Sequence, residues 1–167
     1  MANCLVMENE FQKKQKPVLD LKIAKQKIEH FCAYQERCHQ EVEKKLKSYG
    51  LIPLAIDHLM EQLIDEDFLD EERFARAYAR GSFRHKKWGW KKIELELKKR
   101  NISTYCREKA YSEIDLDEYR LLLSSVLEKK EVKGHSRYQK EQKLIKYAMS
   151  RGFEYELTRS VLDDLFG

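Results

Sequence analysis

The sequence contains few of the residues that interrupt regular structure. Its 167 residues include only two prolines and six glycines. Folds with many tight turns, such as β-sandwiches, need more of both, and so do disordered chains rich in proline and glycine. The alternation of apolar and polar residues that is typical of half-buried strands is missing as well. The composition therefore favours a helical protein.

Long apolar runs are also missing. No stretch approaches the roughly 18 apolar residues that a membrane-spanning helix requires. The first residues, MANCLVMENEFQKKQK, have no uninterrupted apolar core followed by small residues, so we expect no secretory signal. These absences indicate a cytoplasmic protein with no membrane partner. In that compartment Cys4, Cys32, Cys38 and Cys106 are reduced thiols.

Signatures of catalysis and of metal binding are lacking too. The chain has no glycine-rich phosphate loop, no HExxH and no serine in a nucleophile-elbow context. His30, Cys32, Cys38 and His39 lie close together, but their spacing matches no common zinc pattern. We therefore expect no enzyme activity, no catalytic residue, no metal and no cofactor.

Charged and apolar residues are both abundant. Hydrophobic residues make up 42% of the chain and charged residues 37%. This combination is typical of helices that have one apolar face and one charged face. The net charge is only +4, from 33 basic and 29 acidic residues, so the local arrangement of charge says more than the total.

A repeat runs through the chain. Gly50, Asn101 and Gly152 are equally spaced, 51 positions apart, and each follows an amphipathic segment. Glycine and asparagine most easily adopt the left-handed conformation that ends a helix. Apolar pairs four positions apart precede these markers and are expected to point inward: Val42/Leu46, Ile93/Leu97 and Leu144/Ala148.

A Leu-Asp pair opens each repeat. The pairs are Leu19-Asp20, Leu69-Asp70 and Leu116-Asp117. Each aspartate is placed to cap a helix by accepting hydrogen bonds from free backbone N–H groups. Each leucine is expected to pack one turn further on, against Ala24, Phe74 and Leu121 respectively.

A third helix follows each marker. The first starts at Pro53, which suits a first helical turn, and the second is expected to be capped by Ser103. The expected inward residues of these helices are Leu54, Leu59 and Leu63, then Cys106, Ala110 and Ile114, and finally Leu157, Val161 and Leu165. The sequence thus predicts an all-α fold of three tandem three-helix repeats, because periods of this length are typical of stacked helical units. The boundaries are a polar tail over residues 1–17 and repeats over 18–66, 67–115 and 116–167.

The central repeat concentrates charge. The segment Glu61–Glu72 holds seven acids and no base, whereas the segment Arg73–Arg100 holds eleven basic residues and two acids. On a helix from about Glu71 to Phe83, four arginines fall on one narrow stripe: Arg73, Arg76, Arg80 and Arg84. Arginine suits bidentate contact with phosphate or carboxylate, so this stripe goes beyond an ordinary solvated face.

Lysines and tryptophans follow this helix. Trp90 precedes Ile93 and Leu97 by three and seven positions and is expected in the core. Trp88 lies off that stripe and is the better candidate for an exposed contact, while Gly89 marks a helix start or a close backbone approach. We predict a binding site whose arginines are largely exposed and whose members are Arg73, Arg76, Arg80, Arg84, Lys86, Lys87, Trp88, Lys91 and Lys92. Adjacent patches of opposite charge suit a protein of mixed charge as well as a polyanion.

Several runs resemble the RecX family of regulatory proteins. The run FLDEERFA at 68–75, followed by KWG at 87–89 and KIELELKKRNI at 92–102, is similar to the family signature. The run AYQERC at 33–38, with Glu41-Val42 and Lys45-Leu46, resembles its first repeat, and RGF at 151–153 resembles the end of the third. The resemblance spans roughly residues 20–165. Asn101 stands where glycine is usual, and the N-terminal tail matches no part of the pattern.

The resemblance implies a fold and a partner. RecX proteins are bent, elongated arrays of three three-helix repeats. They bind RecA, the recombinase that coats single-stranded DNA as a filament, and typically restrain strand exchange, ATP hydrolysis and the SOS response. By this resemblance we expect a RecA regulator that contacts DNA within the filament. We also expect a monomer. The alternatives are a helical nucleic-acid-binding protein that acts without RecA, and a helical scaffold for another acidic partner.

Overall fold

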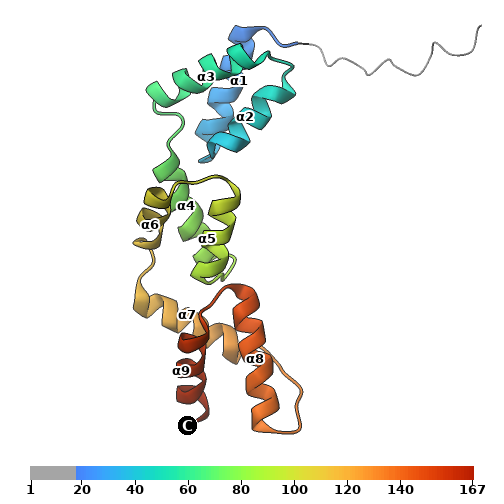
Figure 1. Ribbon diagram of the computed structural model, residues 1–167, viewed down its shortest axis with the longest axis vertical. Coiled ribbons are helices and arrows are strands. Elements are labelled where there is room, and N and C mark those ends of the chain that lie inside the picture. Colours follow the sequence, from blue (N-terminus) through green and yellow to red (C-terminus); the bar gives the residue numbers. More distant parts are fainter. Residues whose placement is uncertain (1–17) are drawn as a thin grey trace, which may run out of the picture. The chain divides into compact units, whose positions relative to one another are not determined.

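The computed structural model describes residues 18–167, and all regular structure within that range is helical (Figure 1). This confirms the predicted all-α class. The helices are α1 (Leu21–Tyr34), α2 (His39–Ser48), α3 (Pro53–Asp65), α4 (Glu71–Arg84), α5 (Trp90–Lys99), α6 (Thr104–Tyr111), α7 (Leu116–Glu128), α8 (Arg137–Arg151) and α9 (Tyr155–Phe166). The prediction of a polar tail over residues 1–17 lies outside the described residues.

The chain forms two compact units. The first contains the residues up to Gln35 together with Glu41–Leu69, and the second contains Glu36–Gln40 and Asp70–Gly167. Three helices lie within each predicted repeat range, so the second unit holds two of these ranges. The boundaries of the three repeats stay a prediction.

Each unit has its own apolar core. In the first unit, buried residues of α1, α2 and α3 meet, among them Ile28, Leu46 and Leu59. In the second unit one continuous cluster joins α4–α9, with Phe83, Ile93, Leu123 and Phe153 among its members. The predicted inward pairs at Val42/Leu46, Ile93/Leu97 and Leu144/Ala148 are all buried.

Helix caps explain where most of the helices begin. The Asp20 carboxylate accepts hydrogen bonds from the first turn of α1, Asp70 does so for α4, and the Ser103 hydroxyl does so for α6. The third predicted aspartate cap is wrong. Asp115 caps α7 instead of Asp117, accepting from the backbone N–H groups of Asp117 and Glu118 at 2.9 Å.

The buried face of α7 also differs from the one predicted. Tyr119, Leu123 and Leu127 form the buried stripe. Leu116 and Leu121 point to solvent, so the predicted packing of one on the other is wrong. Leu54 and Leu165 are also exposed, because the buried stripe of α3 runs through Ile56, Leu59 and Leu63 and that of α9 through Thr158, Val161 and Leu162.

The repeat markers end helices as predicted. Gly50, Asn101 and Gly152 have φ angles of 79°, 58° and 94°, all in the left-handed region. Gly152 directly follows α8, and its backbone N–H donates to the carbonyl of Met149 at 2.9 Å.

Three cysteines lie within the described residues. Cys32, Cys38 and Cys106 are buried and form no disulfide, and Cys4 lies outside this range. Over residues 18–167, no three His, Cys, Asp or Glu side chains gather where they could hold a metal ion. None of the helices described here is both long and apolar enough to cross a membrane.

Candidate nucleic-acid interface

Helix α4 carries the predicted arginine stripe on its outer side. Asp70 accepts a hydrogen bond from the backbone N–H of Arg73 at 2.7 Å, and Glu71 and Glu72 lie in the first turn, where negative charge is favourable. The other side of the helix buries Phe74, Ala75, Ala79, Ser82 and Phe83 in the core of the second unit. This packing fixes which way the arginines face.

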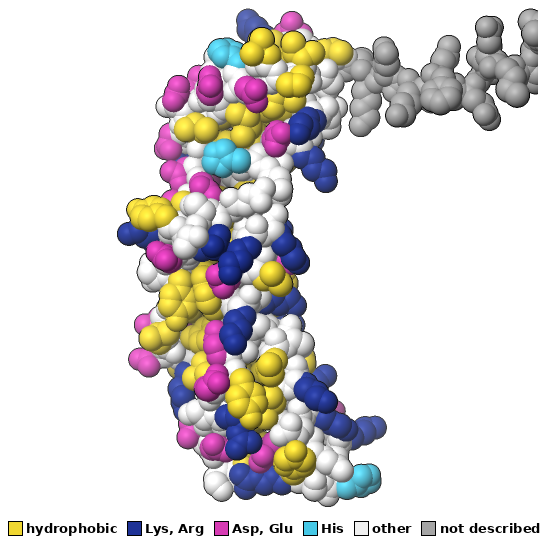
Figure 2. All heavy atoms as spheres, viewed as in Figure 1, with side chains coloured by type: hydrophobic (Ala, Val, Ile, Leu, Met, Phe, Trp, Pro, Cys, Tyr) yellow, Lys and Arg dark blue, Asp and Glu magenta, His cyan; other side chains and the backbone are white. Residues whose placement is uncertain are grey.

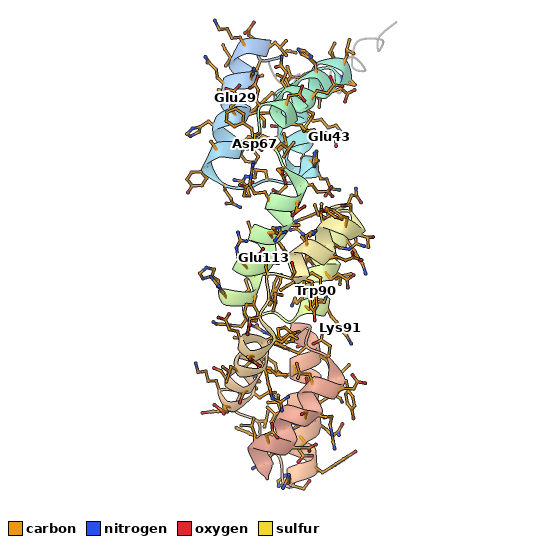
Figure 3. All side chains as sticks on the ribbon, turned by 90° about the vertical axis from the view of Figure 1, so that its left-hand side faces the viewer. Glu29, Glu43, Asp67, Trp90, Lys91 and Glu113 are labelled. Carbon is orange, nitrogen blue, oxygen red and sulfur yellow. The ribbon has the colours of Figure 1, made fainter. Side chains whose placement is uncertain are left out.

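Three of the four arginines form ion pairs within the second unit. Arg73 Nε lies 2.7 Å from Glu36, and Arg80 Nη1 lies 2.8 Å from Glu113. Arg76 contacts both Glu113 and Glu72, the latter at 2.7 Å. Figure 3 labels Glu113, which comes from the turn after α6 and reaches α4.

The expectation that these arginines are largely exposed is wrong. The exposed fractions of the side chains are 37% for Arg73, 30% for Arg76 and 42% for Arg80. The reason is that carboxylates from distant segments cover them. Hydrogen bonds from Arg80 and Arg76 lower the pKa of Glu113, so this carboxylate is ionised at neutral pH. Part of the positive charge of the stripe is therefore neutralised by the chain itself.

A second group of predicted residues has no carboxylate partner. We call Arg84, Lys86, Lys87, Trp88, Lys91 and Lys92 the connection cluster, because they lie at the end of α4, in the turn after it and in the first turn of α5. In the described part of the chain, none of its five cations forms an ion pair with Asp or Glu. Arg84, Lys86, Lys87 and Lys91 are exposed, and Figure 3 labels Lys91 at the start of α5. The face drawn in Figure 2 likewise shows basic side chains lying beside apolar ones.

Trp88 is the aromatic centre of the connection cluster. Its ring lies 4.5 Å from Lys86 Nζ and 4.8 Å from Lys92 Nζ, distances typical of cation–π contacts. The ring is partly buried and packs against the core, so Trp88, the better candidate for an exposed contact, is only partly exposed. Trp90 is also only partly buried, and its ring lies 4.9 Å from that of Tyr111.

The start of α5 is held against the end of α8. The Gly89 N–H donates to the Arg151 carbonyl at 2.9 Å, and the Lys91 N–H donates to the Gly152 carbonyl at 3.1 Å. Free N–H groups of one helix thus satisfy free carbonyls of another. A Cβ on Gly89 would lie 2.3 Å from the Gly152 carbonyl carbon, so only glycine fits. Both predictions for Gly89, a helix start and a close backbone approach, are confirmed.

Tyr119 completes this junction from α7. Its hydroxyl accepts a hydrogen bond from the Trp90 backbone N–H at 2.8 Å and donates to Glu154 at 2.8 Å. Its ring stacks on that of Phe83 and lies tilted against that of Phe153. Burial raises the pKa of Tyr119 well above its usual value, which keeps the hydroxyl protonated. The connection cluster is therefore carried on a fixed backbone.

Two contributors to the surface were not predicted. Tyr78 is not among the predicted binding residues, yet its ring lies 5.2 Å from Lys86 Nζ and 4.9 Å from Arg100. Glu113 was not assigned at all. Helical periodicity could have predicted Tyr78, because this residue lies on the side of α4 next to the arginine stripe. No local pattern predicts Glu113, because it lies 33 residues beyond Arg80 in the sequence.

Comparison with known proteins decides the family. Residues 70–110 match the family model described as RecX, second three-helix domain, and residues 117–162 match RecX, third three-helix domain. Together these matches span more than half of the chain. The chain belongs to the RecX family.

Full-length relatives agree with this assignment. The chain is 27% identical over 143 residues to the regulatory protein RecX of Streptococcus uberis, covering 81% of this chain and 53% of that protein. It is 27% identical over 146 residues to RecX of Geobacillus thermodenitrificans, covering 86% and 54% respectively. The chain thus spans about half the length of these two relatives. RecX of Prosthecochloris aestuarii, 28% identical over 135 residues, is matched over 88% of its length and 81% of this chain.

Solved RecX structures share the fold. The crystal structure of RecX from Lactobacillus salivarius superposes with a TM-score of 0.75 at 23% identity, covering 87% of this chain and 96% of that one. A second crystal structure, of a regulatory protein RecX, superposes with a TM-score of 0.77 at 18% identity, covering 86% of this chain and 73% of that one. The expected helical-repeat fold is confirmed.

Proposed function

We propose that the chain is a non-catalytic regulator that binds the RecA–DNA filament and inhibits RecA ATP hydrolysis and strand exchange, and with them the SOS response. Membership of the RecX family carries this proposal. The filament exposes both protein surface and DNA phosphates, and the chain has both acidic and basic surface residues that could contact them. We further propose that the chain acts as a monomer in the cytoplasm.

The connection cluster is the proposed contact with filament DNA. Lys86, Lys87 and Lys91 are exposed and have no carboxylate partner in the described residues, so they are available to phosphates without breaking an internal ion pair. Arg73, Arg76 and Arg80 join the interface only if phosphates replace Glu36, Glu72 and Glu113. Lysine contacts of this kind release counterions from DNA, which makes binding sensitive to salt.

A matched pair of variants tests this site. Lys87→Gln with Lys91→Gln removes two exposed cations from the connection cluster, and Lys140→Gln with Lys146→Gln removes two exposed cations from α8. Both doubles change the net charge equally. We expect the first double variant to weaken the effect on RecA ATP hydrolysis. We also expect it to reduce the slope of log binding constant against log salt concentration for DNA by roughly one to two. Equal effects of the two doubles would show that total charge matters and that the proposed site does not.

The second candidate is a nucleic-acid-binding protein that acts without RecA. The lysines stacked around Trp88 favour it, because basic and aromatic groups together suit a nucleic-acid strand. Binding to DNA alone at physiological salt separates the two functions. Weak binding that RecA strengthens supports the regulator, and tight binding that RecA does not change supports the alternative.

The third candidate, a scaffold for another acidic partner, is tested by replacing Arg73, Arg76 and Arg80 with alanine. These arginines hold Glu36 and Glu113 in place, so the triple variant is expected to lose some stability as well as binding. Folding of the variant is therefore checked by circular dichroism before binding is measured. A folded triple variant that binds filament and DNA normally would remove these arginines from the site.

A further inference from the structure

A cavity in the first unit has the chemistry of a nucleotide site. It measures about 570 Å³ and lies between α1 and α2. Three aromatic rings line it, those of Phe31, Tyr34 and Tyr49. Lys27, His30 and Lys45 complete the wall, and no carboxylate belongs to the lining. Pockets of this volume are typical of small-molecule sites, and the aromatic walls suit a planar group.

The cations of the cavity are not committed elsewhere in the described chain. The Lys45 Nζ lies 5.6 Å from the Phe31 ring and 5.7 Å from the Tyr49 ring, so its charge is held over the aromatic wall. Neither Lys27 nor Lys45 pairs with a carboxylate among residues 18–167. The neighbouring acids have other partners. Figure 3 labels Glu29 and Glu43, which pair with Lys25 and Lys47.

Tyr34 makes the cavity accessible to a ligand. It is the last residue of α1 and its side chain is exposed, with 80% of the residue open to solvent. An exposed tyrosine beside uncommitted lysines leaves a ring for stacking and a charge for a phosphate. The apolar wall alone would suit an aliphatic helix of a partner protein. The absence of acids and the presence of Lys27 and Lys45 favour an anionic aromatic ligand instead.

We propose that this cavity binds an unstacked base of single-stranded DNA, with Tyr34 and Tyr49 stacking on the base and Lys27 and Lys45 contacting the adjoining phosphates. Aromatic stacking of this kind is tolerant of sequence, because every base has a π face. The choice of DNA as the source of the base rests on the proposed function. The site lies in the first unit and is separate from the connection cluster, which belongs to the second.

The test uses the full chain and a fluorescein-labelled oligothymidylate of roughly 12 nucleotides, a length within the site size of single-strand-binding modules. Fluorescence anisotropy is measured for the wild type and for Tyr34→Ala, Tyr34→Phe and Tyr138→Ala. Tyr138 is another exposed tyrosine, on α8, and serves as the matched control. We expect Tyr34→Ala to weaken binding at least about 5-fold, and the other two variants to bind like the wild type.

An abasic oligonucleotide of the same length separates stacking from phosphate contact. The wild type should bind it more weakly than oligothymidylate, and Tyr34→Ala should show a smaller difference between the two ligands, because Tyr49 still stacks on the base. Lys45→Gln should weaken binding to both ligands and reduce the slope of log binding constant against log salt concentration by about one. Equal affinity of wild type and Tyr34→Ala for oligothymidylate would overturn the proposal. Tighter binding of oligouridylate RNA than of oligothymidylate would overturn the assignment to DNA.

Photo-cross-linking gives an independent readout. An oligonucleotide containing 5-iododeoxyuridine is irradiated with the wild type, and the cross-linked peptide is identified by mass spectrometry. Attachment within residues 26–49 supports the site, and attachment only elsewhere contradicts it.

Failure of this site and failure of the proposed function give different results. If Tyr34→Ala binds DNA normally and the chain still inhibits RecA ATP hydrolysis, only the cavity assignment fails. If the cavity binds DNA and the chain leaves RecA unaffected, only the proposed function fails.

Discussion

Replacing Gly89 with alanine should loosen the junction that carries the connection cluster. The new Cβ would lie 2.3–2.4 Å from three backbone atoms of Gly152 and Phe153. Ordinary contacts at such a carbon begin at 3.4 Å, so the backbones must separate by about 1 Å. Neither partner is a flexible side chain, and the shift therefore moves the end of α8 away from the start of α5.

The cost follows from the hydrogen bonds that this shift stretches. The Gly89–Arg151 and Lys91–Gly152 bonds, at 2.9 and 3.1 Å, become too long, and Gly89 is buried. Breaking two backbone hydrogen bonds, one of them buried, costs about 2–4 kcal/mol. Alanine recovers about 0.4–1 kcal/mol by restricting the unfolded chain. The net loss is about 1–3.5 kcal/mol, which lowers the melting temperature by roughly 2–14 °C for a chain of this size.

Thermal unfolding followed by circular dichroism measures this loss, and Gly81 supplies the control. Gly81 lies inside α4, and a Cβ there meets nothing within 4 Å. Gly81→Ala should therefore stabilise the chain by about 0.5–1 kcal/mol. A Gly89→Ala variant that melts at or above the wild-type temperature would refute the close backbone approach.

Two further variants test the electrostatics of the second unit. Glu113→Gln releases Arg80, leaves Arg76 paired with Glu72 alone, and removes repulsion of about 0.7 kcal/mol toward a phosphate roughly 6 Å away in water. Single-stranded DNA should then bind about threefold more tightly at low salt, and unchanged or weaker binding in anisotropy titrations would argue against phosphate contact at these arginines. Tyr119→Phe loses both hydrogen bonds of the buried hydroxyl and should cost about 1–3 kcal/mol in urea unfolding. Because burial raises the pKa of Tyr119, the folded state keeps a proton that the unfolded state releases above about pH 10. The free energy of unfolding of the wild type should therefore fall as pH rises beyond that value. If the Tyr119→Phe variant shows the same fall, Tyr119 is not the group that causes it.

Helix ends were predictable because their chemistry is local. Asp20 and Asp70 cap the helices that follow them, and Gly152 takes the left-handed conformation that ends α8. Where two candidate caps lie close together, local chemistry does not decide between them. Asp115 and Asp117 are both suitable by local chemistry, and Asp115 is the one that caps α7.

The proposed binding site was less predictable because its charges interact over long sequence distances. Helical periodicity correctly places Arg73, Arg76 and Arg80 on one stripe. It contains no information about Glu36 or Glu113, which reach those arginines from 37 and 33 or more residues away. Exposure of a charged side chain depends on such partners, so the stripe was expected to be more open than it is.

The measurement that bears most directly on the proposed function is ATP hydrolysis by the cognate RecA on single-stranded DNA, titrated with the full chain. We predict that the rate falls at sub-stoichiometric to near-stoichiometric ratios of chain to RecA. The Lys140→Gln, Lys146→Gln control should do the same, and the Lys87→Gln, Lys91→Gln variant should require more protein. An unchanged rate in the presence of folded wild-type chain would contradict the proposed regulation of RecA.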